Sequence, residues 1–374
     1  MLDSKPDNSD SDMTPSNESN PPASRRRSLL KGLAIAGGVV SAATMRPSIS
    51  KAKQSHPATP GDIAILSLLA AAELIEADLW QQYAELGGVT AGTQNPYQLA
   101  LQNLDSDGSQ YITSNTTDEQ SHASFLNAYL ASIGAEPVNL DKFRTLQGSQ
   151  ATGAADIGRL TNLMQLKVDT SWYTRYRSST SPDFGAIFPQ ALPALFAGRF
   201  TAIPQTNADF SNAAHIQAVA NTAAFHFGAI EQGGSSLYAA MSQKVTSAEV
   251  LEITLGIGGD EICHFLEWVD FAGNGVQPPV APLTDPTNGL TFPNFNVPPN
   301  PLLQTNLIFP VPSQFINADL PLCSVIRPIT SAGITATDAI NGLRSSGLFI
   351  GQPREFIDLL LSLAAEADAA QRFS

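Results

Sequence analysis

Apolar side chains recur at three- and four-residue intervals along several segments of this 374-residue chain, a spacing typical of amphipathic helices. Glycines punctuate these segments: Gly61 precedes the first, Gly87 follows it, and Gly134 ends the second. The four longest segments span residues 62–86, 116–133, 208–241 and 247–271. The pattern therefore predicts an all-α protein built on a four-helix bundle at residues 60–272.

The connections between the predicted helices differ in length and composition. Residues 88–115 are polar and contain Asp105-Ser-Asp-Gly-Ser, so we expect a loop; this run lacks the closing Glu of an EF-hand calcium loop. Residues 134–206 are too many for plain coil, and we expect a helix near residues 156–176 within this crossover. One long crossover between the second and third helices is a known arrangement of four-helix bundles.

Residues 273–374 are predicted to be a C-terminal extension of the bundle. Residues 273–315 are rich in Pro and Asn, which is typical of an extended linker or a wrapping arm. Two short helices are expected after it, at residues 335–344 and 353–372. The extension carries no recognisable motif, and we expect it to pack either on the bundle or on a second subunit.

The N-terminal residues have the composition of a targeting segment. Residues 1–24 are acidic and rich in Ser, Asn and Pro, so we expect a disordered tail. Residues 25–52 begin with Arg25-Arg26-Arg27-Ser28-Leu29-Leu30-Lys31, which resembles a twin-arginine export signal, and an apolar run too short to predict a membrane span follows. We expect passage through the twin-arginine translocase to a periplasmic or other extracytoplasmic location. The alternative is that the apolar run is not cleaved and stays as an anchor.

The net charge and the cysteines narrow the classes of function. With 34 acidic and 20 basic residues, the chain carries a formal net charge of −14. Because the phosphates of nucleic acids select basic surfaces, this argues against nucleic acid as a partner. Cys263 and Cys323 either pair in an oxidising compartment or stay free, and neither belongs to a Cys-x-x-Cys pair. A rubredoxin-type iron centre, which needs Cys-x-x-Cys pairs, is therefore not expected.

The candidate chemistry lies in a signature that occurs twice. Each copy begins with Ile-Glu, has a Tyr seven residues after that Glu, and continues further on with Asp-Glu-x-x-His. The residues are Glu76, Tyr83, Asp118, Glu119 and His122 in the first copy, and Glu231, Tyr238, Asp260, Glu261 and His264 in the second. A single Glu-x-x-His is usually a solvated helix face, whereas two copies in matching surroundings are a specific signal.

The spacing within the signature suits a pair of metal ions. Residues three apart lie on one face of a helix, so Glu119 and His122 can point at one spot, as can Glu261 and His264. With one further Glu from each of the other two helices, these side chains form the ligand set of a di-metal site in a four-helix bundle. Carboxylate and imidazole suit iron and manganese, and zinc is also compatible.

Motif and predicted topology together resemble the ferritin-like superfamily of di-metal carboxylate proteins, which includes bacterioferritins, rubrerythrins, manganese catalases and exported ferritin-like domain proteins. The resemblance covers residues 60–272. It implies that Glu76 and His122 are the terminal ligands of one ion and that Glu231 and His264 are the terminal ligands of the other. Glu119 and Glu261 would bridge the two ions.

The resemblance also implies a set of residues around the ligands. Asp118 and Asp260 match carboxylates that accept a hydrogen bond from a ligand histidine, here that of the opposite motif, and thereby orient the imidazole. Tyr83 and Tyr238 match tyrosines just outside the ligands. The sequence also lacks the cysteines of the rubredoxin-type centre that accompanies the bundle in many rubrerythrins.

Two glutamates are candidates for the metal ligand on the first predicted helix. Glu73 lies one turn before Glu76 and falls on the same inward stripe. We prefer Glu76 because its spacing to Tyr83 repeats at Glu231, and Glu73 is the alternative metal ligand.

Two histidines and a group of glycines on the third and fourth predicted helices lie outside the repeated signature. His215 and His226 are expected to be hydrogen-bonded core or rim histidines. A group of glycines flanks the expected ligands, and it either leaves room for substrate, allows close helix contact or distorts the helices. These glycines are Gly233, Gly234, Gly256, Gly258 and Gly259.

Three functions remain open at this point. The first is an exported oxidoreductase in which two iron or two manganese ions react with O2 or peroxide, through peroxide breakdown, ferroxidation or oxidation of another substrate. The second is a non-catalytic metal-binding or stress-protective bundle. The third is a partner-binding module that acts through the C-terminal arm. A homo-oligomer is compatible with each, whereas export, the long crossover and the extension argue against a storage cage.

Overall fold

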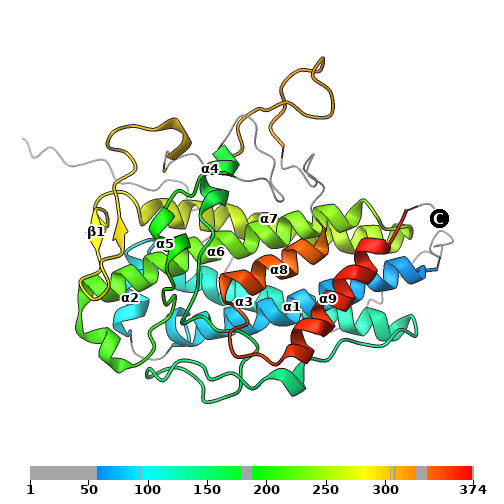
Figure 1. Cartoon of the computed structure of the whole chain (residues 1–374), viewed down its shortest axis with the longest axis horizontal. Helices are drawn as coiled ribbons and strands as arrows, with labels where there is room; N and C mark the ends of the chain where they lie inside the picture. The colour runs from blue at the N-terminus through cyan, green and yellow to red at the C-terminus, as the bar shows by residue number, and fades with distance from the viewer. Residues whose placement is uncertain are drawn as a thin grey trace, which may run out of the picture. The chain divides into compact units, whose positions relative to one another are not determined.

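The computed structural model describes residues 57–91, 94–177, 188–303, 305, 309–325 and 335–372. Among these residues the longest elements are four helices: α1 (Pro60–Gly87), α3 (Gly108–Ser132), α6 (Ala213–Ser242) and α7 (Ala248–Asn274). They run lengthwise beside one another, as Figure 1 shows, with α1 packed mainly on α3 and α6 mainly on α7. The predominantly helical fold that the periodicity predicted is confirmed.

The contacts along α1 establish the direction of its neighbours. Glu73 contacts His122 of α3, whereas Trp80, two turns further along α1, contacts Thr116 of α3. The two helices are therefore antiparallel.

Helix α6 is also antiparallel to α1, because Glu73 contacts Tyr238 while Trp80 contacts Glu231. Helices α3 and α6 consequently run in the same direction, and the segment that joins them must return along the whole bundle. This geometric demand explains why the connection between α3 and α6 is long.

The helix boundaries follow from local capping chemistry. At the start of α1, Thr59 and Asp62 form a capping box, with Pro60 at the first helical position. Helix α6 starts after Asn212, whose side chain accepts from the amides of Ala214 and His215. These interactions satisfy amide groups that have no partner inside the helix.

The prediction of a loop at residues 88–115 was wrong for much of the segment. Helix α2 (Pro96–Gln102) forms there, capped by Asn95, and α3 begins at Gly108, eight residues before the predicted start at 116. The start of α3 was not predicted because its side chains are polar. Ser109 and Asn115 are nevertheless buried, where they make polar contacts. Gly108 packs on the ring of Phe271, where a Cβ atom would lie 2.6 Å from the ring edge.

The predicted helix at 156–176 was also wrong except at its end. Only Ser171–Arg177 is helical (α4); the other short elements of the crossover are α5 (Pro193–Ala197), a 3-10 turn η1 (Asp141–Phe143) and a 3-10 helix η2 (Asn207–Ser211). Residues 157–170 instead run along the bundle, and their amides find partners elsewhere. The buried carboxylate of Asp78 on α1 accepts hydrogen bonds from the amides of Leu160 and Thr161 at 3.0 and 2.9 Å.

The C-terminal extension folds back on the bundle. It contains a two-stranded hairpin, β1 (Leu283–Thr284) and β2 (Thr291–Phe292), a 3-10 turn η3 (Pro301–Leu303), and two helices, α8 (Ala336–Ser346) and α9 (Arg354–Ala369). The two predicted C-terminal helices are thus confirmed. Helix α9 packs on α8 and on α1, so the extension covers its own bundle (Figure 1).

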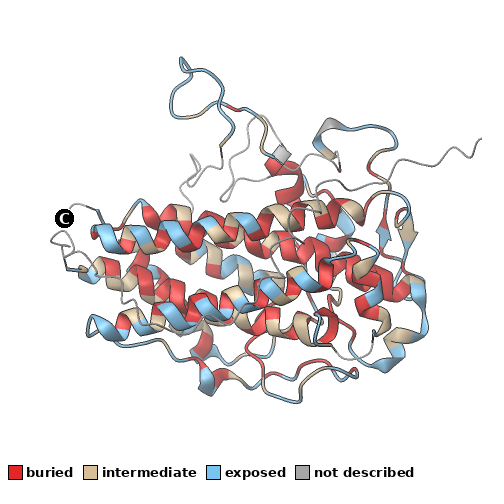
Figure 2. Ribbon diagram, turned by 180° about the vertical axis from the view of Figure 1, so that it is seen from behind, coloured by how far each residue is buried: buried red, intermediate tan, exposed pale blue. Residues whose placement is uncertain are grey.

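The core lies between the four long helices and under the crossover, as the burial colours of Figure 2 show. Trp172 and Tyr173 of α4 are part of it, because both pack on Phe225.

Both cysteines, Cys263 and Cys323, are exposed free thiols. None of the described helices combines the length and hydropathy that a bilayer crossing requires. The predicted acidic tail and export signal lie outside the described residues.

Candidate metal centre

Carboxylates and imidazoles from all four long helices meet in the middle of the bundle. They form two overlapping groups of four residues, each with potential ligand atoms within 4.8 Å of one another, and His264 also belongs to a third such group with Asp118 and Asp260. One group is Glu73, Glu119, His122 and Glu261; the other is Glu119, Glu231, Glu261 and His264. Glu119 and Glu261 belong to both groups, so they lie where bridging carboxylates of two ions would lie.

The first half of the cluster is organised around His122 of α3. Its Nδ1 atom lies 3.4 Å from Glu73 Oε2, 3.4 Å from Glu119 Oε2 and 3.7 Å from Glu261 Oε1. The imidazole therefore faces three carboxylates from three different helices.

The second half is organised in the same way around His264 of α7. Its Nδ1 atom lies 3.2 Å from Glu119 Oε1 and 3.3 Å from Glu231 Oε2. The centroids of the two imidazole rings are 6.3 Å apart, which places the shared carboxylates between them.

The other nitrogen of each imidazole faces an aspartate of the opposite motif. His122 Nε2 lies 3.3 Å from Asp260 Oδ2, and His264 Nε2 lies 3.3 Å from Asp118 Oδ2. An Nε2–H that donates to a carboxylate leaves the Nδ1 lone pair directed at the cluster, which is the tautomer a metal ligand needs. This crossed pairing is the one that the resemblance implied for Asp118 and Asp260.

The structure places Glu73 in the cluster and leaves Glu76, the preferred ligand, outside both groups. Tyr238, seven residues after Glu231, donates its hydroxyl to Glu73, and Trp80, seven residues after Glu73, donates its indole N–H to Glu231 at 2.8 Å. Each aromatic side chain thus supports the glutamate of the other helix. In the structure the counterpart of Glu231 on α1 is therefore Glu73. The spacing to a tyrosine had suggested Glu76, one turn further along the helix.

Glu76 and Tyr83, which have that spacing, occupy different positions. Glu76 is intermediate in exposure and lies one turn beyond Glu73; burial of its carboxyl group, followed by the charge of Glu119, raises its pKa well above the ordinary value. Tyr83 points away from the carboxylates, and its hydroxyl lies 2.8 Å from Nδ1 of His226. Of the two candidate tyrosines, only Tyr238 contacts a member of the cluster.

Asn115 and Trp268 are site residues that the sequence analysis missed. The Asn115 amide donates to Glu119 Oε1 at 2.7 Å and to Glu231 Oε1 at 3.3 Å, and it lies 3.3 Å from His264 Nδ1. Trp268 holds this amide by donating its indole N–H to Asn115 Oδ1 at 2.7 Å. Asn115 lies four residues before Glu119, on the same helix face, and that spacing was the available signal.

The metal-free cluster is electrostatically strained. Burial, followed by the charge of Glu231, raises the pKa of Glu119 to about 8. Burial also raises the pKa of Glu261 well above its ordinary value, and the charge of Glu119 adds to this. Burial alone would lower the pKa of His264, but Glu231 and Glu119 beside it raise that pKa to about 12.

Several carboxylate oxygens in the cluster have no hydrogen-bond donor among the described residues: Glu73 Oε2, Glu231 Oε2 and both side-chain oxygens of Glu261. Buried, unsatisfied acceptors of this kind are costly. Two divalent cations would neutralise the four carboxylates of the two groups and would satisfy these oxygens. The residues therefore fit a pair of metal ions.

Two glycines allow the helices to approach closely at this site. A Cβ atom on Gly234 of α6 would lie 2.4 Å from Glu261 Oε2, and one on Gly258 of α7 would lie 2.8 Å from Tyr238 Cβ. The neighbouring Gly233, by contrast, faces open space. Of the alternatives considered for these glycines, Gly234 and Gly258 therefore serve close helix contact.

The cluster approaches the surface between α3 and α7. The side chains of His122 and His264 are each 9 % exposed, whereas Asp118 and Asp260 are 41 % and 43 % exposed. The two aspartates thus form the rim of the site, and the ligand carboxylates lie beneath it.

The two remaining histidines of α6 are hydrogen-bonded, as predicted. His226 pairs with Tyr83 in the core, and His215 Nδ1 lies 2.9 Å from Asp285 Oδ2 of the hairpin, which ties β1 to α6. Neither histidine belongs to a potential metal group among the described residues.

Comparison with models of known protein families gave no match, and neither did comparison with curated proteins or with solved structures.

Proposed function

We propose that this protein holds two iron or two manganese ions in a ferritin-like bundle and acts as an oxidoreductase on O2 or peroxide. The observation that carries the proposal is the pair of overlapping four-residue groups that share Glu119 and Glu261. Shared carboxylates keep two ions close enough to act on one small molecule.

Each ion would have its own terminal ligands in addition to the shared carboxylates. Glu73 and His122 would hold one ion, and Glu231 and His264 would hold the other. When bound, such a pair supplies a place for O2 or peroxide and the ability to change oxidation state. Asp118 and Asp260 orient the imidazoles, as the crossed 3.3 Å contacts allow.

The course of the helices supports the ferritin-like part of the proposal. Helices α3 and α6 run in one direction, both antiparallel to α1, and a long segment joins them. This course is compatible with the one-crossover bundle in which di-metal carboxylate sites are built, and it supports the proposal on that ground.

Export through the twin-arginine route is part of the same proposal. The basis is Arg26-Arg27 and the apolar run that follows. The route carries folded proteins, which suits a metal centre buried between four helices. Replacing both arginines by lysine should retain the precursor in the cytoplasm, and unchanged export would contradict this part.

A non-catalytic metal-binding bundle is the second candidate, and the burial of the site favours it. Glu73, Glu119, Glu231 and Glu261 are fully buried, and only the imidazole edges approach the surface. A structural metal site is saturated by protein ligands, whereas a catalytic site keeps an open position.

The experiment that separates the two candidates is reaction of the loaded protein with oxidant. The protein would be loaded anaerobically with Fe(II) or Mn(II), and consumption of added O2 or hydrogen peroxide would be followed. We expect consumption that disappears in a Glu119→Ala/Glu261→Ala variant and persists in Glu252→Ala, which changes an exposed glutamate of the same helix α7. Bound metal without consumption of either oxidant would favour the non-catalytic bundle.

A further inference from the structure

A cavity of about 520 Å³ lies at the start of α6, away from the metal centre. His215, which lines this cavity, precedes the candidate ligand Glu231 by 16 residues, so the two lie about 24 Å apart along the helix axis. The volume is within the range of cavities that hold small molecules. The cavity is therefore separate from the site of the proposed function.

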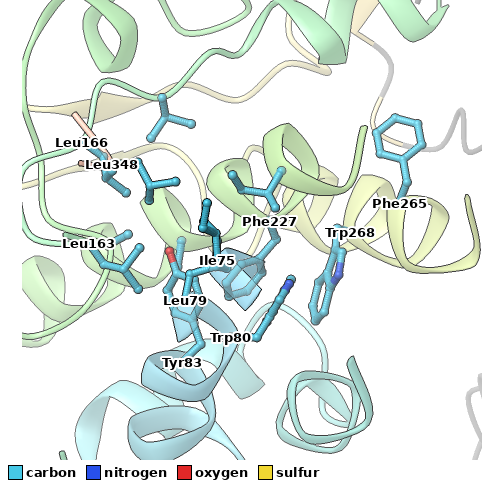
Figure 3. Close-up of a cluster of buried hydrophobic side chains, with 14 of the residues drawn as sticks. Ile75, Leu79, Trp80, Tyr83, Leu163, Leu166, Phe227, Phe265, Trp268 and Leu348 are labelled. Carbon is cyan, nitrogen blue, oxygen red and sulfur yellow. The ribbon is translucent and has the colours of Figure 1, made fainter. Parts of the chain in front are cut away.

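The fold itself shapes one wall of this cavity. The backbones of Leu166 and Phe200 exchange two hydrogen bonds, at 2.8 and 2.9 Å. Leu163 and Leu166 belong to the buried cluster that Figure 3 shows. The two residues between them, Met164 and Gln165, line the cavity. The wall is thus anchored in the core and is formed before any ligand arrives.

A buried histidine of the cavity wall is held in one orientation. His215 is 9 % exposed, and its Nδ1 lies 2.9 Å from Oδ2 of Asp285. Asp285 is itself buried, and it accepts hydrogen bonds from the amide of Thr287 at 2.8 Å and from the side chain of Asn288 at 2.9 Å. These contacts fix the imidazole and leave Nε2 facing Asp209, which also lines the cavity.

The contact on this second side of the imidazole is incomplete. Nε2 of His215 lies 3.5 Å from Oδ1 of Asp209, which is longer than a normal hydrogen bond. In the neutral imidazole, donation by Nδ1 leaves Nε2 as an acceptor, so two acceptors face each other. The other oxygen of Asp209 accepts from the amides of Gln205 and Thr206, which hold the carboxylate in place. A ligand with two neighbouring hydrogen-bond donors would satisfy both atoms.

The rest of the lining indicates the chemical class of this ligand. Arg199 and Asp209 carry opposite charges, so the wall selects neither an anion nor a cation. Phe200 adds a half-buried apolar ring. The other polar groups are amides and hydroxyls, which both donate and accept, among them those of Gln165, Gln205, Ser211, Asn212 and Asn288. A sugar has the complementary surface, because it presents hydroxyl groups at its edge and C–H groups on its face.

We propose that this cavity binds a neutral sugar of one or two rings. Two adjacent hydroxyl groups of the sugar donate to Nε2 of His215 and to Oδ1 of Asp209, a third accepts from Arg199, and the C–H face lies on Phe200. The inference does not depend on the proposed function, because the residues of this cavity and those of the metal centre are different.

The test is saturation-transfer NMR on the full chain with glucose, mannose, galactose and maltose as probes, followed by calorimetry of each sugar that binds. We expect at least one of the four to bind. Asp209→Asn keeps an acceptor for the amides of Gln205 and Thr206 but removes the charged oxygen, so it should weaken binding about tenfold. Phe200→Ala should also weaken binding. Asp156→Asn is the matched control, because this exposed aspartate of the crossover lies outside the cavity.

Three results would overturn the inference. They are absence of binding by all four sugars, binding that Asp209→Asn and Phe200→Ala leave unchanged, and binding of inorganic phosphate without binding of any sugar. Metal content and circular dichroism of the same samples show whether the variants are folded. Both should be unchanged in Asp209→Asn, so a failure of sugar binding is distinguished from a failure of the metal centre.

Discussion

The two halves of the metal centre have the same ligand types and different supports. Around His264, the Asn115 amide contacts Glu119, Glu231 and the imidazole itself, and Trp80 adds a second donor to Glu231. Around His122, the support that the described residues give to Glu73 is a single hydroxyl, that of Tyr238. The position equivalent to Asn115, four residues before Glu261, is Ile257.

This difference teaches that ligands and their supports are separate features of the chain. The repeated Glu-x-x-His determines which atoms face the centre, whereas unlike residues one turn away determine how firmly they are held. A better-supported half loses less freedom when an ion binds. We therefore expect the ion beside His264 to bind more tightly than the ion beside His122.

The largest expected effect comes from removing either imidazole. His122→Ala and His264→Ala should each reduce metal content from about two ions per chain to about one, because each histidine belongs to a different one of the two four-residue groups. The ion that remains in His122→Ala should bind more tightly than the one that remains in His264→Ala. Mass spectrometry of dialysed protein measures the content. Loss of both ions in both variants would break the comparison, since the halves would then act as one unit.

The next effect concerns the close approach of α6 to the shared carboxylate. Gly234→Ala places a methyl group 2.4 Å from Glu261 Oε2, so this carboxylate must move. We expect metal affinity to fall by about 10- to 100-fold, the range seen when support around ligands is disturbed. Gly233→Ala is the matched control, because its Cβ meets nothing within 4 Å. Equal affinities of the two variants would contradict the role of Gly234.

A smaller effect should separate the two supports. Asn115→Ala should weaken the ion beside His264 by about tenfold, and Tyr238→Phe should weaken the ion beside His122 by less, since it removes one hydroxyl. Stepwise titration with Mn(II), monitored by calorimetry, resolves the two binding events. The asymmetry would be refuted if either substitution weakened both events equally.

The smallest effect is the pH dependence of the metal-free protein. Glu119 has its pKa raised from 4.5 to about 8, so it binds its proton more tightly folded than unfolded, and the resulting stabilisation is lost between pH 4.5 and pH 8. His122 acts in the same direction: burial opposes its charge, but Glu119 and Glu73 raise its pKa from 6.5 to about 10. Stabilisation by His122 is complete below pH 6.5 and lost as the pH rises through 10.

Thermal melts across pH 5 to 9 measure this dependence. We expect the Tm of the metal-free protein to fall by a few degrees as the pH rises, and Glu119→Gln to flatten the fall below pH 8. Metal-loaded protein should lack the fall, because ions bind deprotonated carboxylates. A Tm that rises with pH in the metal-free protein would contradict the proton assignments.

The sequence predicted the helices and most of the cluster because both have a period. Apolar spacing located α1, α6 and α7, and the repeat located Glu119, His122, Glu261 and His264 on inward faces. The start of α3 was missed because Ser109 and Asn115 are polar residues buried by partners that lie far away in the sequence.

The choice between Glu73 and Glu76 could not be made from spacing along one helix. The aromatic partner of each glutamate lies on the other helix, and a tryptophan replaces a tyrosine at one of the two positions. The helix predicted within the crossover at residues 156–176 was wrong for a similar reason. Its backbone is held by tertiary contacts, such as those to Asp78, rather than by a helical pattern of its own.

The most direct test of the account is the metal content of the folded protein after loading with Fe(II) or Mn(II) and extensive dialysis. The account predicts about two ions per chain, lost together in Glu119→Ala/Glu261→Ala and retained in Glu252→Ala. Absence of stably bound metal in the unmodified protein, at neutral pH and after reconstitution with either ion, would contradict it.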